Sequence, residues 1–304
     1  MILSIVKYKF LKYNNINKFW SLKMNLANIK TIESILKKEG FSFKKSLGQN
    51  FLIDESVCPQ MAAMACDSEM GVLEIGPGIG VLTAELSKVA KRVVAIELDD
   101  RLRTILPKTL ADCQNVEIIF GDAMKLDLKE IIKEKFSDCS KVCVCANLPY
   151  YITSPIIMML LESKLPIDNI TVMVQKEAAE RLCATVGTRD AGAVTVAVSY
   201  YSEAEILFHV GRASFMPPPN VDSAVIQLKI RENPPIAVSD EKKFFGFVKA
   251  CFAQRRKTLV NTVSNTLNIS KETLRNALIE EGISETIRSE QLTIEELAKI
   301  AEKI

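Results

Sequence analysis

Residues 71–80 read Gly-Val-Leu-Glu-Ile-Gly-Pro-Gly-Ile-Gly. The apolar run predicts a short strand, and the three alternate glycines predict a tight loop that leads into a helix from Val81. Because glycine has no side chain, the backbone of this loop can approach a ligand closely. The pattern therefore favours an open α/β sheet with a ligand site at the end of this strand.

The glycine spacing separates two kinds of cofactor site. A dinucleotide fingerprint reads Gly-x-Gly-x-x-Gly, but counting from Gly76 the sixth position is Val81, and an acid, Glu74, lies inside the preceding strand. This spacing argues against a nicotinamide dehydrogenase.

Two later apolar runs end in acids. The run at 92–99 contains Glu97 near its end, and the Glu97 carboxylate can accept two hydrogen bonds from ribose hydroxyls. Nicotinamide enzymes place an acid at a similar position, so this residue does not separate the two cofactors. The run at 116–123 ends near Asp122, which can either receive the amine of a cofactor adenine or act as a plain turn or cap residue. Neither acid alone identifies the cofactor.

Residues 144–151 read Val-Cys-Ala-Asn-Leu-Pro-Tyr-Tyr. An adenine amine is a poor nucleophile, and the Asn147 side-chain oxygen with the Leu148 carbonyl can orient and polarise its N–H bonds. Tyr150 can stack on the base, a contact worth roughly 1 to 3 kcal/mol. The alternative is a strand end followed by an ordinary turn at Pro149, with Tyr150 half-buried.

The ends of parallel strands meet at one edge of a sheet, so we expect these polar positions to line one crevice. They are Gly76, Glu97, Asp122 and Asn147. Their order along the chain is typical of an S-adenosylmethionine enzyme.

With these motifs the chain resembles the ribosomal RNA adenine dimethyltransferase family, and within it the members that act on 16S rRNA. Three further segments carry the resemblance: 45–52 matches the amino-terminal signature, 215–223 the proline-rich segment, and 254–259 the basic motif of the small helical domain. The match runs from about Leu26 to the end of the chain.

The resemblance implies a role for each matching position. The cofactor is S-adenosylmethionine, and the expected cofactor-binding residues are Asn50, Leu52, Gly76, Gly78, Glu97, Asp122 and Asn147. The expected base-binding residues are Asn147, Leu148, Pro149, Tyr150 and Phe215, with Phe215 stacking opposite Tyr150. Phosphate contacts are expected from Lys44, Lys45, Arg255, Arg256 and Lys257, although most basic runs are simply solvated helix faces.

The implied activity is N6-dimethylation of two adjacent adenines in a 3′-terminal hairpin loop of 16S rRNA, within an immature small ribosomal subunit. Two alternatives stay open. One is a 23S rRNA adenine methyltransferase that confers antibiotic resistance, against which Pro217, Pro218 and Pro219 and the basic motif weigh. The other is an assembly factor that binds RNA without transferring methyl groups.

The expected architecture is a class I S-adenosylmethionine-dependent methyltransferase domain, with a Rossmann-like, seven-stranded, mostly parallel sheet, over residues 24–232. Asn233-Pro234-Pro235 marks a linker, and residues 233–304 are expected to form a small all-helical domain that docks RNA. Residues 1–23 form a basic, aromatic extension. We expect Met24 to be the true initiator, rather than the extension to be a functional arm.

Composition agrees with this reading. Residues 1–60 hold ten lysines and four acids, a net charge of +6 against +2 for the whole chain, which suits an anionic partner. Eight cysteines without a Cys-x-x-Cys pair, and a single histidine, make a metal site improbable. No apolar run at the start is long enough for a signal core or a membrane span, so we expect a reduced, cytoplasmic protein, and nothing demands more than a monomer.

Overall fold

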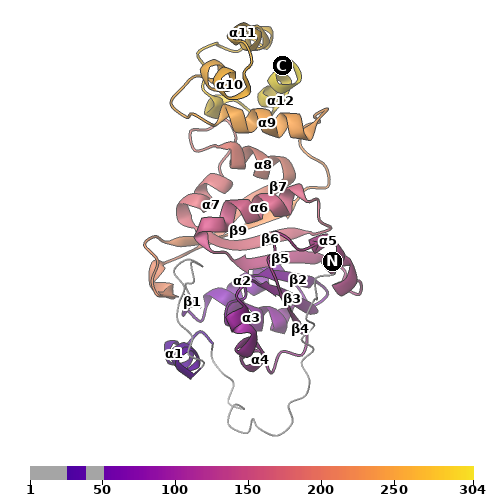
Figure 1. Ribbon diagram of the computed structural model, residues 1–304, viewed down its shortest axis with the longest axis vertical. Coiled ribbons are helices and arrows are strands. Elements are labelled where there is room, and N and C mark those ends of the chain that lie inside the picture. Colours follow the sequence, from indigo (N-terminus) through magenta and orange to yellow (C-terminus); the bar gives the residue numbers. More distant parts are fainter. Residues whose placement is uncertain (1–25, 39–50) are drawn as a thin grey trace. The chain divides into compact units, whose positions relative to one another are not determined.

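The computed structural model describes residues 26–38 and 51–304 (Figure 1). The expected extension at 1–23 lies outside the described residues. The strands of the main sheet are β2 (Gly71–Ile75), β3 (Arg92–Glu97), β4 (Val116–Phe120), β5 (Val142–Asn147), β6 (Asn169–Gln175), β7 (Ser202–Val210) and β9 (Ser223–Ile230). The helices are α1 (Ile29–Lys38), α2 (Val57–Ala65), α3 (Val81–Val89), α4 (Leu106–Thr109), α5 (Leu128–Lys135), α6 (Thr153–Glu162), α7 (Lys176–Leu182), α8 (Ala193–Tyr201), α9 (Glu241–Cys251), α10 (Leu259–Leu267), α11 (Lys271–Glu280) and α12 (Ile294–Glu302).

The seven strands form one sheet in the order β4-β3-β2-β5-β6-β9-β7. Strand β2 pairs in parallel with β3 and β5, and the parallel pairing continues outward to β4 and β6. Strand β9 is antiparallel to β6. The predicted fold class, a seven-stranded, mostly parallel sheet, is confirmed.

Helical crossovers explain why the central strands are apolar along their whole length. A parallel pair needs a long connection, and the connection places helices on the faces of the sheet. All five residues of β2 are buried, and α3 connects β2 to β3. The carboxyl ends of β2, β3, β4 and β5 are thereby brought to one edge.

The glycine loop after β2 turns sharply because three of its residues adopt left-handed backbone. Gly76, Gly78 and Gly80 have φ values of +72°, +59° and +92°, a region that other residues rarely adopt. Helix α3 begins directly afterwards at Val81. The alternate glycines are therefore needed for the backbone path.

A second, two-stranded sheet joins distant parts of the sequence. Strand β1 (Phe51–Leu52) pairs antiparallel with β8 (Phe215–Met216). Next to it, the Ile53 amide donates to the Ser214 carbonyl at 2.8 Å, and the Ser214 hydroxyl donates to the Asp54 carboxylate at 3.0 Å. This pairing places the proline-rich segment, which begins at Phe215, beside the end of the amino-terminal signature at Leu52.

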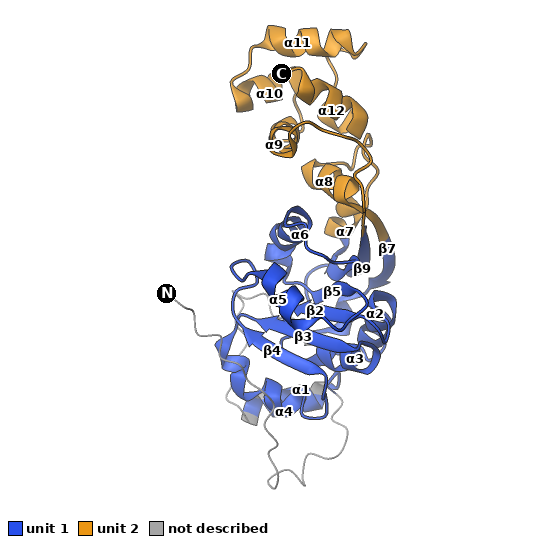
Figure 2. Cartoon of the chain, turned by 90° about the vertical axis from the view of Figure 1, so that its right-hand side faces the viewer, with its two compact units in different colours: residues 1–176, 206–229 blue, residues 177–205, 230–304 orange. Residues whose placement is uncertain are grey.

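The chain divides into two compact units, coloured separately in Figure 2. Unit 1 comprises residues 1–176 and 206–229, and unit 2 comprises 177–205 and 230–304. Their limits differ from the expected domains of 24–232 and 233–304, because residues 177–205 group with the carboxyl-terminal helices.

The core of unit 2 explains this grouping. Val196 and Tyr200 of α8 are buried in the same apolar cluster as Phe244 and Phe247 of α9. The Tyr200 and Phe244 ring centroids are 6.0 Å apart. Helix α8 is apolar on most of its surface, and the side that carries Val196 and Tyr200 is buried in the cluster with α9.

Three features of the described part of the chain bear on function. None of its helices has the length and apolar character needed to cross a membrane. It contains no group of three or more His, Cys, Asp or Glu side chains placed to hold a metal ion. All eight cysteines are free thiols.

Candidate functional site

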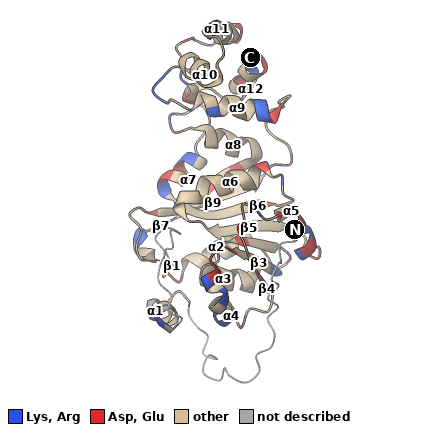
Figure 3. Cartoon of the chain, in the orientation of Figure 1, with Lys and Arg blue, Asp and Glu red and all other residues tan. Residues whose placement is uncertain are grey.

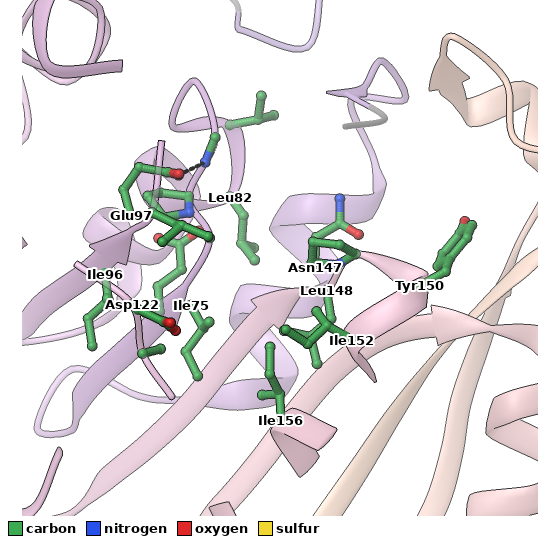
Figure 4. Close-up of a pocket in the computed structure, with 18 of the residues that line it drawn as sticks. Ile75, Leu82, Ile96, Glu97, Asp122, Asn147, Leu148, Tyr150, Ile152 and Ile156 are labelled. Atoms are coloured by element: carbon green, nitrogen blue, oxygen red, sulfur yellow. Dashed lines mark hydrogen bonds between the residues drawn. The ribbon is translucent and has the colours of Figure 1, made fainter. Parts of the chain in front are cut away.

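A cavity opens at the carboxyl ends of β2, β3, β4 and β5 (Figure 4). In Figure 4, Asn147 lies between Glu97 and Asp122 on one side and Tyr150 on the other. The predicted site residues that line it are Leu52, Gly76, Gly78, Glu97, Asp122, Asn147, Leu148, Pro149, Tyr150 and Phe215. The strand ends thus share one cavity.

The other predicted site residues are elsewhere. Asn50, Lys44 and Lys45 lie outside the described residues. Arg255, Arg256 and Lys257 belong to unit 2, are exposed, and do not line this cavity.

Glu97 ends β3 and holds the glycine loop. Its carboxylate accepts hydrogen bonds from the Gly78 amide at 3.1 Å and from the Asp99 amide at 2.7 Å. The side chain is 6% exposed, and burial raises the pKa of Glu97 to about 7 in spite of these bonds. Each carboxylate oxygen can accept a further hydrogen bond from a ligand in the cavity.

Glu74 is a second acid of the cavity, in the middle of the buried strand β2. It is 1% exposed, and its Oε2 atom has no hydrogen-bond partner among the described residues. Burial raises the pKa of Glu74 to about 8. An unpaired buried carboxylate is unfavourable, and a bound cation would relieve that cost.

Asp122 begins the turn after β4. Its carboxylate accepts a hydrogen bond from the Met124 amide at 3.0 Å and forms an ion pair with Lys125 at 3.4 Å. The turn role considered from the sequence is therefore present. The same carboxylate also faces the cavity, so the two roles are compatible.

Asn147 is the last residue of β5, and its side chain is partly exposed to the cavity. The side-chain amide of Asn147 has no hydrogen-bond partner among the described residues. Leu148 is fixed behind it, since its amide donates to the Met173 carbonyl of β6 at 3.3 Å. An amide with open hydrogen-bonding capacity is suited to a polar group of a ligand.

Tyr150 is held by a partner that the sequence did not indicate. Its hydroxyl lies 2.7 Å from the hydroxyl of Ser223, the first residue of β9, which is fully buried. Burial of the Tyr150 side chain raises its pKa. The aromatic ring is therefore anchored at its far end.

Phe215 reaches the cavity from β8, next to Leu52 of β1. The residue is 2% exposed, so only a small part of its ring faces the cavity. Its position depends on the pairing of β1 with β8.

Three exposed apolar or aromatic side chains line the mouth of the cavity. Leu98 is 55% exposed, Met124 is 39% exposed and Tyr151 is 59% exposed. Leu98 follows Glu97, and Met124 follows Asp122 by two positions. Such surfaces are typical of a place where a flat ring is bound.

A family model described as ribosomal RNA adenine dimethylase matches residues 40–304. The chain belongs to this family. The membership predicted from the motifs is thus confirmed.

Curated relatives in the dimethylase family are similar over most of the chain. A protein of Anoxybacillus flavithermus named ribosomal RNA small subunit methyltransferase A is 49% identical over 92% of this chain and 96% of its own length. A protein of the same name from Geobacillus thermodenitrificans is 51% identical over 88% of this chain and 93% of its own.

Two solved structures share the fold. A dimethyladenosine transferase from Plasmodium falciparum has a TM-score of 0.64 and 27% identity, over 82% of this chain and 95% of that one. The 23S rRNA methyltransferase ErmE has a TM-score of 0.62 and 26% identity, over 84% of this chain and 99% of that one.

Sequence reasoning left out several residues of this dimethylase cavity. One of them is Glu74, although an acid inside an apolar strand is itself a signal of a buried charge. Leu98 and Met124 gave no signal, because isolated apolar residues are common on surfaces. The contact of Ser223 with Tyr150 joins positions 73 residues apart and had no local sign.

Proposed function

We propose that this dimethylase transfers methyl groups from S-adenosylmethionine to N6 of two adjacent adenines in the 3′-terminal hairpin loop of 16S rRNA, within an immature small ribosomal subunit. The observation that carries the proposal is the single cavity lined by both Glu97 and Asn147. The identity of about half to proteins named small subunit methyltransferase A supports the choice of rRNA. Eight free thiols are in keeping with action in the cytoplasm.

The residues present fit the proposed cofactor. S-adenosylmethionine is a cation, and Glu74 offers an unpaired buried carboxylate at the cavity. A Cβ atom on Gly76 would meet no atom within 4 Å, so the space above the glycine loop is open to a ligand. The site therefore combines a buried acidic group, which a bound cation would favour in its charged form, with room for close approach to the backbone.

The acids at the ends of β3 and β4 hold the nucleoside part. Glu97 accepts hydrogen bonds from the ribose hydroxyls, and Asp122 accepts one from the adenine amine. Leu98 and Met124, which are exposed and line the cavity, would supply apolar contacts to the adenine ring. The family resemblance implies that Asn50 and Leu52 also contact the cofactor.

The opposite side of the cavity receives the target base. Asn147 accepts a hydrogen bond from the N6 amine through its side-chain oxygen, and the Leu148 carbonyl accepts the second. Tyr150 stacks on the flipped ring, with Phe215 on the other face and Pro149 shaping the turn between them.

When bound, S-adenosylmethionine supplies an electrophilic methyl carbon. Asn147 and Leu148 align the amine with that carbon and stabilise the positive charge that develops on nitrogen. The proton of the alkylated amine then leaves to solvent, so the chain needs no histidine base. In the second transfer the monomethylated amine has a single N–H bond, so it can donate to only one of these two acceptors.

Labelled S-adenosylmethionine and immature small subunits test the proposal directly. We expect label in N6,N6-dimethyladenosine at two adjacent positions of 16S rRNA, mapped by nuclease digestion and mass spectrometry. Label in 23S rRNA instead would favour the antibiotic-resistance activity. Tight binding of the particle without transfer would favour a role in assembly alone.

The Ser223 hydroxyl is expected to act on the rate only through Tyr150. Ser223→Ala and Tyr150→Phe each remove one hydrogen bond, worth about 0.5–1.5 kcal/mol, so we expect each to lower the single-turnover rate by roughly 2- to 10-fold. The double variant should be no slower than either single variant, because both remove the same contact.

Cofactor affinity is the control, and it should not change in any of the three variants. A further loss when Ser223→Ala is added to Tyr150→Phe would show that Ser223 acts in another way.

A further inference from the structure

Tyr151 is an aromatic residue at the mouth of the cavity to which the proposed function gives no part. It lines the cavity and is 59% exposed, whereas Tyr150, the residue before it, is half-buried and anchored to Ser223. Among the described residues, the Tyr151 side chain has neither a hydrogen-bond partner nor a contact with another aromatic ring. An aromatic ring left uncovered beside a binding pocket is available to a ligand.

The backbone that carries Tyr151 has a defined place. It forms a short 3₁₀ helix over Tyr150–Ile152, directly before α6. The Ile152 amide donates to the Pro149 carbonyl at 3.1 Å, and the Thr153 hydroxyl, which is buried, donates to the same carbonyl at 3.3 Å. The exposure of Tyr151 therefore follows from a turn that is fixed by hydrogen bonds on both sides.

This 3₁₀ helix directs the two tyrosines at different partners. A 3₁₀ helix has three residues per turn, so consecutive side chains differ in direction by about 120°. Tyr150 is directed toward Ser223 and, in the proposed function, stacks on the flipped adenine. Tyr151 leaves the backbone in another direction, so the flat group that it can cover is a second ring at the mouth of the cavity.

The segment around the turn carries no charge. Residues 147–161 contain no Lys, Arg, Asp or Glu, and Figure 3 draws this stretch in tan, the colour of uncharged residues. A phosphate group finds no cationic side chain here, whereas a nucleobase can stack on an aromatic ring through its π-face. The chemistry of the turn therefore favours a base over the phosphate backbone of RNA.

We propose that Tyr151 is a substrate-binding residue that stacks on the nucleobase next to the flipped adenine in the RNA strand. The inference rests on the proposed function, which supplies two adjacent adenines as the substrate. When one adenine leaves the stack and enters the cavity, its neighbour loses a stacking partner. The Tyr151 ring replaces that partner. For one of the two targets the base on the Tyr151 side is the other adenine of the pair.

The single-turnover rate of methyl transfer, with small-subunit particles below saturation, tests the contact. We expect Tyr151→Ala to lower this rate by roughly 5- to 100-fold, the usual effect of losing one stack between a base and an aromatic ring. Tyr151→Phe keeps the ring and should act as the wild type does. Tyr151→Leu keeps only apolar surface and should resemble Tyr151→Ala.

Met64→Ala is the matched control for an exposed apolar side chain. Met64 is 42% exposed on α2 of the same unit and does not line the cavity. Its replacement should leave the rate at the wild-type value.

Reconstituted particles that carry an abasic residue in place of one of the two adenines show which base is contacted. The remaining adenine is then the single target. We expect the effect of Tyr151→Ala to disappear in the particle that lacks the base on the Tyr151 side of the target, and to persist in the other particle. An equal effect in the native and in both abasic particles would overturn the inference, because Tyr151 would then act without touching the neighbouring base.

Cofactor affinity and methyl transfer by the wild type separate this inference from the proposed function. The Kd for S-adenosylmethionine should stay within about twofold in Tyr151→Ala, and a clearly weaker Kd would assign the ring to the cofactor and overturn the inference. If the wild type methylates 16S rRNA and Tyr151→Ala does so at the same rate, the inference is wrong and the proposed function stands. Wild type that transfers no methyl group to the particles shows that the proposed function is wrong, and the inference fails with it.

Discussion

Replacing Asn147 by alanine is expected to lower the rate of methyl transfer by about 10²- to 10³-fold, the usual cost of removing one preorganised polar group from a reacting centre. The reason is that the Asn147 amide faces the cavity without a partner among the described residues, so its oxygen is available to orient the amine. The Kd for S-adenosylmethionine should stay within about twofold, because the groups proposed to hold the cofactor are at the other end of the cavity. Single-turnover kinetics and calorimetry measure the two quantities separately.

Asn147→Asp provides the matched comparison for this variant. It keeps an acceptor oxygen at the same position, so it should retain more activity than Asn147→Ala if the oxygen orients the amine. Loss of cofactor binding in Asn147→Ala would assign the residue to the cofactor instead.

Replacing Glu97 by glutamine is expected to give the opposite result. A hydrogen bond to a charged group is worth about 1.5–3 kcal/mol, so the Kd for S-adenosylmethionine should rise by roughly 10- to 100-fold. The rate at saturating cofactor should change little, because Glu97 is not proposed to touch the target amine. Calorimetry and saturation kinetics distinguish these two effects.

The pH dependence of cofactor binding gives a second readout for Glu97. Burial raises the pKa of Glu97 to about 7, and only the carboxylate accepts two ribose hydrogen bonds, so affinity should increase as the pH rises toward 7. Glu74, with its pKa raised to about 8, contributes in the same direction because a cation binds its charged form. Below pH 7, log Kd should fall as the pH rises, and Glu97→Gln should make this slope less negative by about one.

Glu74→Gln is the companion control, since it removes the other titrating acid while leaving Glu97 in place. Unchanged affinity and an unchanged pH slope in Glu97→Gln would remove Glu97 from the ribose site.

The local motifs predicted the chemistry of the cavity because each is a continuous run of residues. The backbone at positions 76, 78 and 80 is left-handed, and glycine adopts this conformation more readily than any other residue type. Glu97, Asp122 and Asn147 each follow an apolar run, and parallel strands bring such ends together. Both the fold class and the family followed from these runs.

The division into units was not predictable in the same way. The linker at 233–235 was visible, but the assignment of α8 depends on which apolar surface it covers. A helix that is apolar on most faces can pack against a sheet or against other helices with equal local propensity. Only the contact between Tyr200 and Phe244 shows which packing the chain adopts.

The sequence by itself determined the strand-and-loop order, the family and the polar groups that face the ligand, because backbone conformation and strand ends are local properties. The tertiary structure alone decided that Ser223 anchors Tyr150, that β8 sets Phe215 beside Leu52, and that Arg255 binds backbone carbonyls. Each of these contacts joins residues far apart in the chain, and a hydrogen bond across such a distance leaves no pattern in the order of the amino acids.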